Sequence, residues 1–197
     1  YRHLFTVKKN LIGTIPVCTP PHDITGQPYE SYLPQGEGAS ILRDLMERSV
    51  GLMTDHPVNI SREKGGKRKA NMLWFWSGGI KPGFIPLKER FGLSGCVISA
   101  VDLVRGIAFF AGVRNIDVPG ITGYYDTNYK GKAEYAIKTL EECDIMFVHV
   151  EAPDEASHNG DAQEKIRAIE NFDRFVVGPV HKALKDKGDY RVLVMPD

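Results

Sequence analysis

The strongest constraint on the fold is an alternation of short apolar runs with amphipathic stretches, which begins near Ala70 and continues to the end of the chain. Such alternation is typical of a mainly parallel sheet whose two faces are covered by helices. The apolar runs predict strands near 72–76, 96–100, 145–150 and 191–195. The stretches between them predict helices over 101–111, 132–142, 161–177 and 179–188. We therefore predict an α/β fold from residue 70 onward.

Apolar spacing also predicts which faces of two of these helices are buried. Gly112 ends the first helix, as glycine commonly does. Asp161, with Glu164 three residues later, forms a capping-box-like start for the second. The expected inner residues are Leu103, Val104, Ile107, Phe110 and Ala111 in the first helix, and Ile166, Ile169, Phe172, Phe175 and Val176 in the second.

The first 69 residues differ in character, because Pro, Gly and Thr are frequent before Gly38. One strand is expected at 11–16. A helix is expected over 39–52, and the basic segment 61–69, which contains two glycines, predicts an exposed loop. The residues with helical spacing that predict the buried face of the 39–52 helix are Ile41, Leu42, Leu45, Met46 and Val50.

Composition narrows the class of protein. The chain of 197 residues carries 25 acidic and 25 basic side chains, which implies no nucleic acid or other polyelectrolyte partner. Its apolar runs are too short to cross a bilayer, so we expect no membrane partner and a cytoplasmic location. The cysteines, Cys18, Cys96 and Cys143, are widely spaced and predict reduced packing residues.

The stretch 151–161 follows the predicted 145–150 strand and is the strongest candidate for a chemical site, since ligands of α/β sheets gather where strands end. Asp154 and His158 offer a carboxylate and an imidazole, which suit manganese or zinc better than magnesium. Spacing alone leaves open that Asp154 caps a turn and that His158 begins a helix. Asp197 places another carboxylate after the last predicted strand.

Several neighbouring polar residues have ordinary structural interpretations. Asp161 is predicted to cap a helix, and His149 to be a packed, hydrogen-bonded side chain. Glu151 and Glu155 are either groups that orient metal ligands or solvated charges.

Two further groups of residues are candidates for binding an anion. The segment 120–132 combines glycines, hydroxyl and amide donors, Lys130 and Lys132, all suited to a phosphate. The alternative is a polar loop with solvated lysines. The other candidates, which also suit an ordinary exposed surface, are Arg2, His3, His22, Asp23 and Arg62.

Several phrases in order, TPPHD, HPVN, ISAVDLVRGIAFFAG, VPGITGYYDTNYKGK, HVEAPDEASHNGD and LVMPD, resemble the archaeal-type cofactor-independent phosphoglycerate mutases of the alkaline phosphatase superfamily. The resemblance covers essentially the whole chain. It implies an alkaline-phosphatase-like, mainly parallel sheet with helices on both faces. It further implies that residues 70–197 are the second part of this metal-binding core and that residues 1–69 are the C-terminal part of an inserted α+β substrate-binding domain.

The resemblance also implies which metal ions the protein uses, which residues bind them and which residues contact the substrate. Two divalent ions are expected, usually manganese, with zinc or magnesium as alternatives, and no 2,3-bisphosphoglycerate is needed. Asp154 and His158 match two ligands of one ion, and Asp197 matches a ligand of the other. The substrate contacts would come from Arg2, His3, His22, Asp23, Arg62, Lys130 and Lys132.

The nucleophilic serine of these mutases belongs to a segment that we do not find here, so we expect a fragment of a larger protein with no catalytic nucleophile of its own. Ser157 stands where the family usually has glycine. The expected reaction interconverts 2-phosphoglycerate and 3-phosphoglycerate, both small phosphorylated substrates. The alternatives are a homoserine kinase, since bacterial relatives carry that label, another small-molecule phosphotransferase or phosphatase, and an inactive binding module.

Overall fold

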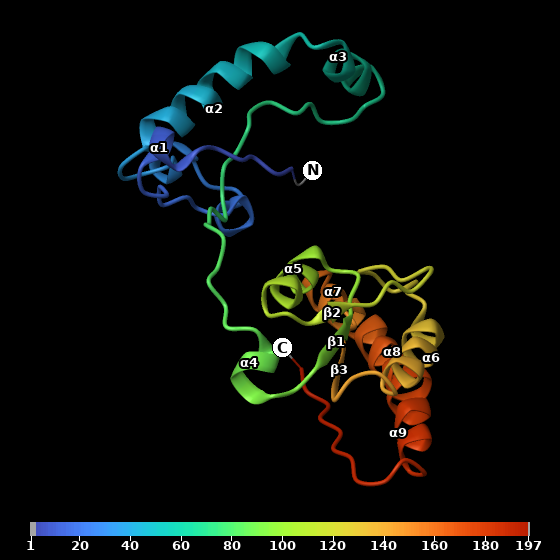
Figure 1. The fold of residues 1–197 in the computed structure, drawn as a ribbon. Coiled ribbons are helices and arrows are strands. Elements are labelled where there is room, and N and C mark those ends of the chain that lie inside the picture. Colours follow the sequence, from blue (N-terminus) through green and yellow to red (C-terminus); the bar gives the residue numbers. More distant parts are fainter. Residues whose placement is uncertain (1–2, 197) are drawn as a thin grey trace. The chain divides into compact units, whose positions relative to one another are not determined.

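The computed structural model describes residues 3–196, except for the side chain of Lys9. Arg2 and Asp197, two of the predicted site residues, lie outside the described residues. The chain forms two compact units that divide between Lys81 and Pro82, and both can be followed in Figure 1.

The division lies later than the predicted boundary between residues 69 and 70, because the segment 70–81 packs with the N-terminal unit. The indole Nε1 of Trp74 donates to the carbonyl of Thr19 at 2.8 Å, and the rings of Phe5 and Phe75 lie 4.9 Å apart. The strand predicted at 72–76 is therefore wrong, since its aromatic side chains anchor an extended segment that pairs with no strand in the part of the chain described.

The N-terminal unit is mainly helical. Its helices are α1 (Lys9–Ile12), α2 (Ala39–Thr54) and α3 (Pro57–Lys64), with short 3-10 turns η1 (Pro21–Ile24) and η2 (Glu30–Tyr32). Its extended pairing is a single bridge between Val17 and Gln35 among the residues described. The described residues therefore do not show the β part of the predicted α+β domain.

Three predictions in this unit have different outcomes. The strand expected at 11–16 is wrong, because Gly13 adopts a φ of +69° directly after α1 and turns the chain. The 39–52 helix is confirmed as α2, in which Leu42 and Met46 are buried, whereas Ile41 and Val50 are exposed. The 61–69 loop is wrong in its first half, since residues 61–64 form the exposed last turn of α3.

The C-terminal unit is built on a parallel sheet of β1 (Gly95–Ile98), β2 (Arg114–Asn115) and β3 (Ile145–Val148), in the order β2-β1-β3. Cys96 of β1 pairs with Arg114 on one side and with Met146 on the other. The strands predicted at 96–100 and 145–150 are thus confirmed. The strand predicted at 191–195 is wrong: Leu193 is 82% exposed, and residues 191–196 find no neighbouring strand among the residues described. An apolar run becomes a strand only where a neighbour supplies backbone partners.

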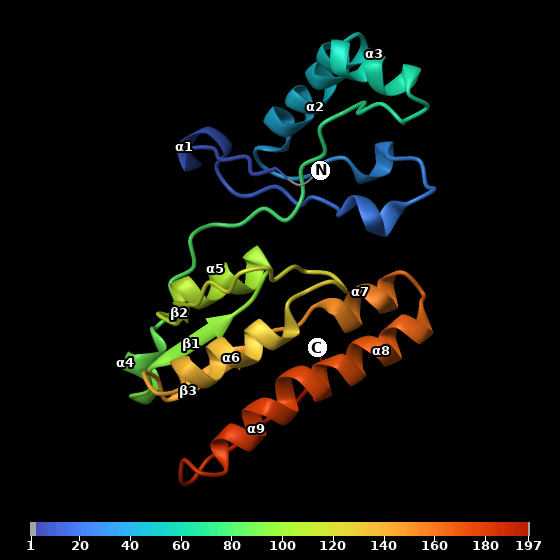
Figure 2. The same cartoon turned by 90° about the vertical axis from the view of Figure 1, so that its right-hand side faces the viewer.

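The helices of this unit alternate with its strands and confirm the α/β alternation. They are α4 (Leu87–Phe91), α5 (Asp102–Phe110), α6 (Tyr129–Thr139), α7 (Ala152–His158), α8 (Ala162–Phe172), the π-helical turn η3 (Asp173–Val177) and α9 (Gly178–Leu184). Figure 2 shows that α8, η3 and α9 follow one another as one long rod.

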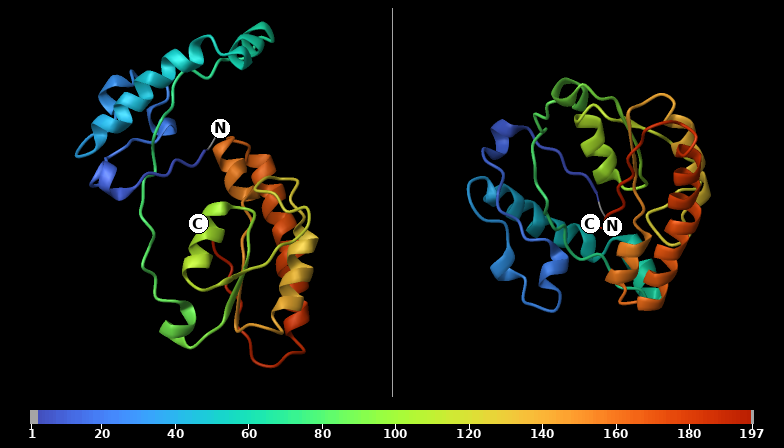
Figure 3. Two further views of the ribbon diagram at one scale, coloured as in Figure 1. Left: turned by 45° about the horizontal axis from the view of Figure 1, so that its top comes forward. Right: turned by 90° about the horizontal axis from the view of Figure 1, so that it is seen from below.

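Helices cover both faces of the sheet, as predicted. Successive residues of a strand point to opposite faces. Val97 accordingly packs with Ala108 of α5, and Ile98 packs with Ala136 of α6. Figure 3 shows α5 on one side of the sheet, with α6, α8 and α9 on the other.

The predicted inner faces of α5 and α8 are partly wrong. In α5, Ala108 is buried, whereas Leu103 is 72% exposed and Ile107 is 50% exposed. In α8, Ala168 is buried, whereas Ile166 and Ile169 are about half exposed. The apolar stripe on each helix is wider than its contact, and the small alanines allow the closest approach.

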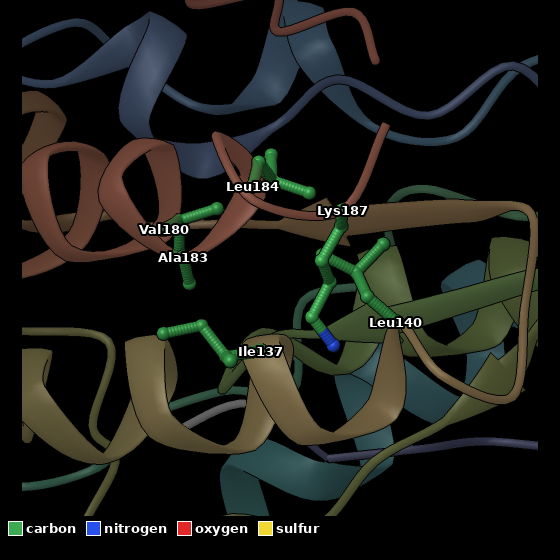
Figure 4. A pocket seen from close by; sticks show the side chains of 6 residues that line it. All are labelled: Ile137, Leu140, Val180, Ala183, Leu184 and Lys187. Atoms are coloured by element: carbon green, nitrogen blue, oxygen red, sulfur yellow. The ribbon is translucent and has the colours of Figure 1, made fainter. Parts of the chain in front are cut away.

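The apolar contact between α6 and α9 is shown in Figure 4, where Ile137 of α6 and Leu140, the residue directly after α6, face α9. The facing side chains of α9 are Val180, Ala183 and Leu184. Beyond α9, Lys187 donates through Nζ to Oε1 of Glu141 at 2.7 Å. The long rod is therefore held on α6 by apolar packing and by an ion pair at its end.

Gly112 and Gly106 form a matched test of this fold. Gly112 has a φ of +68°, and an added Cβ would lie 3.1 Å from Cβ of Pro86, so Gly112→Ala should destabilise the full-length protein by about 1 to 2 kcal/mol. Gly106 lies inside α5 with open space at its Cβ position, so Gly106→Ala should stabilise it by about 0.5 to 1 kcal/mol. Thermal unfolding of both variants measures the two changes in stability, which should have opposite signs. Equal shifts in melting temperature would contradict the ending of α5 before Gly112.

Candidate functional site

The candidate site lies where the parallel strands end. Ser99 follows β1 and His149 follows β3, and the backbone N–H of His149 donates to the carbonyl of Ile98 at 2.9 Å. Because parallel strands end at the same edge of the sheet, the two residues that follow them are neighbours. The chain then enters α7 at Glu151, with Pro153 in the first turn, a position where its missing N–H costs nothing.

Asp154 and His158 lie one helical turn apart on α7 and share a face. Oδ2 of Asp154 lies 3.2 Å from Nε2 of His158, and their side chains are 33% and 74% exposed. Two ligands bound to one ion at about 2.1 Å, with an angle of 90 to 109°, lie about 3.0 to 3.4 Å apart. The observed separation and the accessible donor atoms therefore fit two ligands of one divalent ion.

The structure brings together two of the predicted ligands. Among residues 3–196, no group of three or more His, Cys, Asp or Glu side chains is placed to hold a metal ion. Asp197, the ligand predicted for the second ion, is outside those residues. Asp154 and His158 are therefore brought together, and their role as ligands of one ion stays a prediction.

The glycine-rich segment before α6 packs against the end of α7. The hydroxyl of Tyr125 donates to the carbonyl of Glu155 at 3.3 Å and accepts from Nδ2 of Asn159 at 2.8 Å. The ring of Tyr124 stacks on that of Tyr125 with centroids 4.0 Å apart. Two motifs that are distant in the sequence therefore meet beside His158.

Asp161 has the structural role that the sequence predicts. Its Oδ1 accepts from the backbone N–H of Glu164 at 2.9 Å and so caps α8. The Asp161 carboxylate therefore serves to start α8 after the turn that follows α7, and we do not count it among the candidate ligands.

Lys130 and Lys132, which composition treats alike, occupy different environments. Nζ of Lys130 lies 5.3 Å from the centroid of the Phe175 ring, and its side chain is exposed. Lys132 is 1% exposed, and its Nζ donates to the carbonyl of His149 at 2.7 Å. Burial lowers the pKa of Lys132 to about 8, and the charge of Glu151 opposes that shift. The interpretation of this segment as a loop with two solvated lysines is therefore wrong for Lys132.

A polar cluster connects these residues. Nε2 of His149 lies 3.0 Å from Oε2 of Glu151, and its Nδ1 lies 3.1 Å from Oγ of Ser99. His149 is thus a packed, hydrogen-bonded side chain, as predicted, and Glu151 is not a solvated charge, since 22% of its side chain is exposed. Sequence reasoning did not select Ser99; the signal was its position directly after an apolar strand.

The remaining candidates lie in the N-terminal unit. Nε2 of His22 lies 3.7 Å from Oδ1 of Asp23, and the His22 ring meets the Trp76 ring edge-on with centroids 5.3 Å apart. Arg62 donates through Nε to the carbonyl of Arg68 at 2.9 Å, and His3 lies in an exposed segment. His22 and Asp23 are therefore brought together, and substrate contact by all four residues stays a prediction.

Comparison with known sequences identifies the family. The metalloenzyme superfamily matches residues 44–197. The chain belongs to this superfamily. The 2,3-bisphosphoglycerate-independent phosphoglycerate mutase family matches residues 1–59.

Curated relatives of this superfamily member match it from end to end. It is 50% identical to the 2,3-bisphosphoglycerate-independent phosphoglycerate mutase 2 of Methanothermobacter thermautotrophicus, over 100% of this chain and 49% of that protein. It is 48% identical to the mutase of Methanosarcina barkeri, over 100% of this chain and 50% of that protein. The chain spans about half the length of the curated relatives it matches.

Solved structures agree with the superfamily fold. A Pyrococcus horikoshii protein is 31% identical with a TM-score of 0.65, over 74% of this chain and 38% of that chain. The cofactor-independent phosphoglycerate mutase of Thermoplasma acidophilum is 25% identical with a TM-score of 0.51, over 88% of this chain and 44% of that chain.

Within residues 3–196, no helix has the length and apolar character that crossing a membrane requires.

The buried ammonium of Lys132 predicts a pH dependence of stability. Its pKa is about 8 in the folded chain against 10.5 ordinarily, so between these values the unfolded state binds more protons and stability rises with pH. Between pH 7.5 and 9.5 the full-length protein should gain about 2 kcal/mol relative to Lys132→Met.

Thermal unfolding at the two pH values, without added metal, measures this difference. The matched control is Lys138→Met, also in α6 but exposed, which should keep the wild-type pH response. An equal pH response in the wild type and Lys132→Met would contradict the burial of this ammonium.

Proposed function

We propose that the full-length protein containing this chain interconverts 2-phosphoglycerate and 3-phosphoglycerate by metal-dependent phosphoryl transfer. The carrying observation is the Asp154–His158 pair, whose donor atoms are spaced for one ion. The pair lies in a chain that matches proteins named as 2,3-bisphosphoglycerate-independent mutases over its whole length. That name also supports a reaction without bound 2,3-bisphosphoglycerate.

In this proposal Asp154 and His158 hold one divalent ion and Asp197 helps to hold a second. Bound ions neutralise charge on a phosphoryl group and lower the pKa of an attacking hydroxyl. Manganese suits the mixed carboxylate and imidazole donors, with zinc as the next choice and magnesium the least suited. The cytoplasmic location predicted from the sequence belongs to the same proposal.

The phosphoryl-accepting serine is proposed to lie outside this chain. Ser157 is a poor candidate, because its Oγ donates to the carbonyl of Pro153 at 3.2 Å and accepts a hydrogen bond from Lys165. Its hydroxyl is thus occupied by contacts near α7. The proposed substrate contacts of the N-terminal unit are Arg2, His3, His22, Asp23 and Arg62.

Metal binding by the full-length protein tests the first part of the proposal. Alanine at Asp154 or His158 should remove one of two manganese ions, because each variant leaves one ligand of the pair. Asp161→Ala, which removes a nearby carboxylate that caps α8, should keep both ions and cost about 1 kcal/mol of stability. Isothermal titration with Mn²⁺ gives the stoichiometry; two ions bound by Asp154→Ala would refute the ligand assignment.

Turnover tests the substrate. With manganese, the full-length protein should interconvert the two phosphoglycerates, and Asp154→Ala should lower kcat at least 100-fold, by the usual size of a lost metal-ion contribution. ATP and homoserine are offered in a parallel assay. Phosphorylation of homoserine without mutase turnover would favour the kinase, and neither activity in a protein that binds metal would favour an inactive binding module.

A further inference from the structure

Lys132 is the largest side chain of the described residues that is fully buried, and its chemistry is unusual for such a place. An ammonium has three donors and is strongly hydrated, so its burial requires polar partners. Its hydrogen bond goes to the carbonyl of His149 at 2.7 Å, and the charge of Glu151 is near enough to favour the ammonium form. Lys132 therefore joins α6 to the segment between β3 and α7.

His149 connects this ammonium to both strand ends. Oγ of Ser99 accepts the backbone N–H of Val101 at 3.0 Å and lies 3.1 Å from Nδ1 of His149. Nε2 of His149 faces Oε2 of Glu151 at 3.0 Å, and because a carboxylate oxygen accepts, Nε2 is the donor of this contact. The ring is thus held from both sides, and 29% of it is exposed.

Glu151 connects the side chain of His149 to the helix that carries the candidate ligands. It is the residue before α7, and its carbonyl accepts the backbone N–H groups of Asp154 at 2.9 Å and of Glu155 at 3.1 Å. The same residue thus anchors the first turn of α7 by its backbone and binds His149 by its side chain. Asp154 is in that turn, and His158 is one turn later.

We propose that Lys132, His149 and Glu151 form a positioning cluster that fixes the start of α7 and thereby the spacing of Asp154 and His158 for their ion. The inference rests on the proposed metal site and assigns these three residues a role apart from substrate contact. In this proposal the buried ammonium of Lys132, which donates to the carbonyl of His149, positions the segment 149–151 and takes the place of the phosphoryl contact expected from the sequence. Side chains that orient metal ligands typically contribute 10- to 100-fold to metal affinity.

Manganese titration of the full-length protein tests the cluster. Glu151→Ala should weaken one Mn²⁺ site about tenfold or more, and Lys132→Met should weaken the same site. Glu151→Gln keeps an acceptor for Nε2 of His149 and should stay within about threefold of the wild-type affinity. The matched control is Glu155→Ala, which removes a neighbouring charge whose carboxylate has no hydrogen bond to His149.

A double variant tests the connection between the members. If Lys132 and Glu151 act through one cluster, their effects on affinity should not add. Wild-type affinity in Glu151→Ala, or a loss no larger than that of Glu155→Ala, would overturn the cluster while leaving the metal site intact. Two ions bound by Asp154→Ala would overturn the metal site and the cluster together. The three glutamate variants decide the question even if Lys132→Met fails to fold.

Discussion

The parallel pairing of β1 with β3 is the interaction on which the candidate site depends. It places the residues after the two strands side by side, with the N–H of His149 bound to the carbonyl of Ile98. Ser99 and His149 then meet through their side chains, and Glu151 follows at the start of α7. A separation of 50 residues in sequence becomes a contact of about 3 Å, and the position of Asp154 follows from it.

β1, the central strand of this pairing, is buried on both of its faces. Val97 and Ile98 pack on opposite sides, under α5 and α6. Ser99 and Lys132 are buried beside this packed interior and are shielded from water, so their polar atoms need hydrogen-bonding partners within the protein. The same packing that stabilises the sheet thus explains why the polar residues at its edge form a connected cluster.

The sequence predicts the parts of the fold that depend on local pattern. It identifies β1, β3, α2, the cap at Asp161 and the proximity of Asp154 to His158, since periodicity, capping and spacing are short-range. It fails where a neighbouring segment decides the outcome, as at 72–76, whose aromatic side chains pack with the N-terminal unit, and at 191–195, which finds no neighbouring strand among the described residues. Lys132 is the clearest example. A lysine is normally expected to be exposed to solvent, and only the tertiary packing shows that Lys132 is buried.

The π-helical turn between α8 and α9 changes the direction in which the side chains point around the common helix axis. The N–H of Gly178 bonds to the carbonyl of Asp173, five residues back, so this turn contains more residues than its neighbours. The side chains after it are out of phase with those before it by about one residue, roughly 100°. A single helical wheel over 162–184 therefore misaligns the two halves, and the stripe of α9 that meets α6 has its own phase.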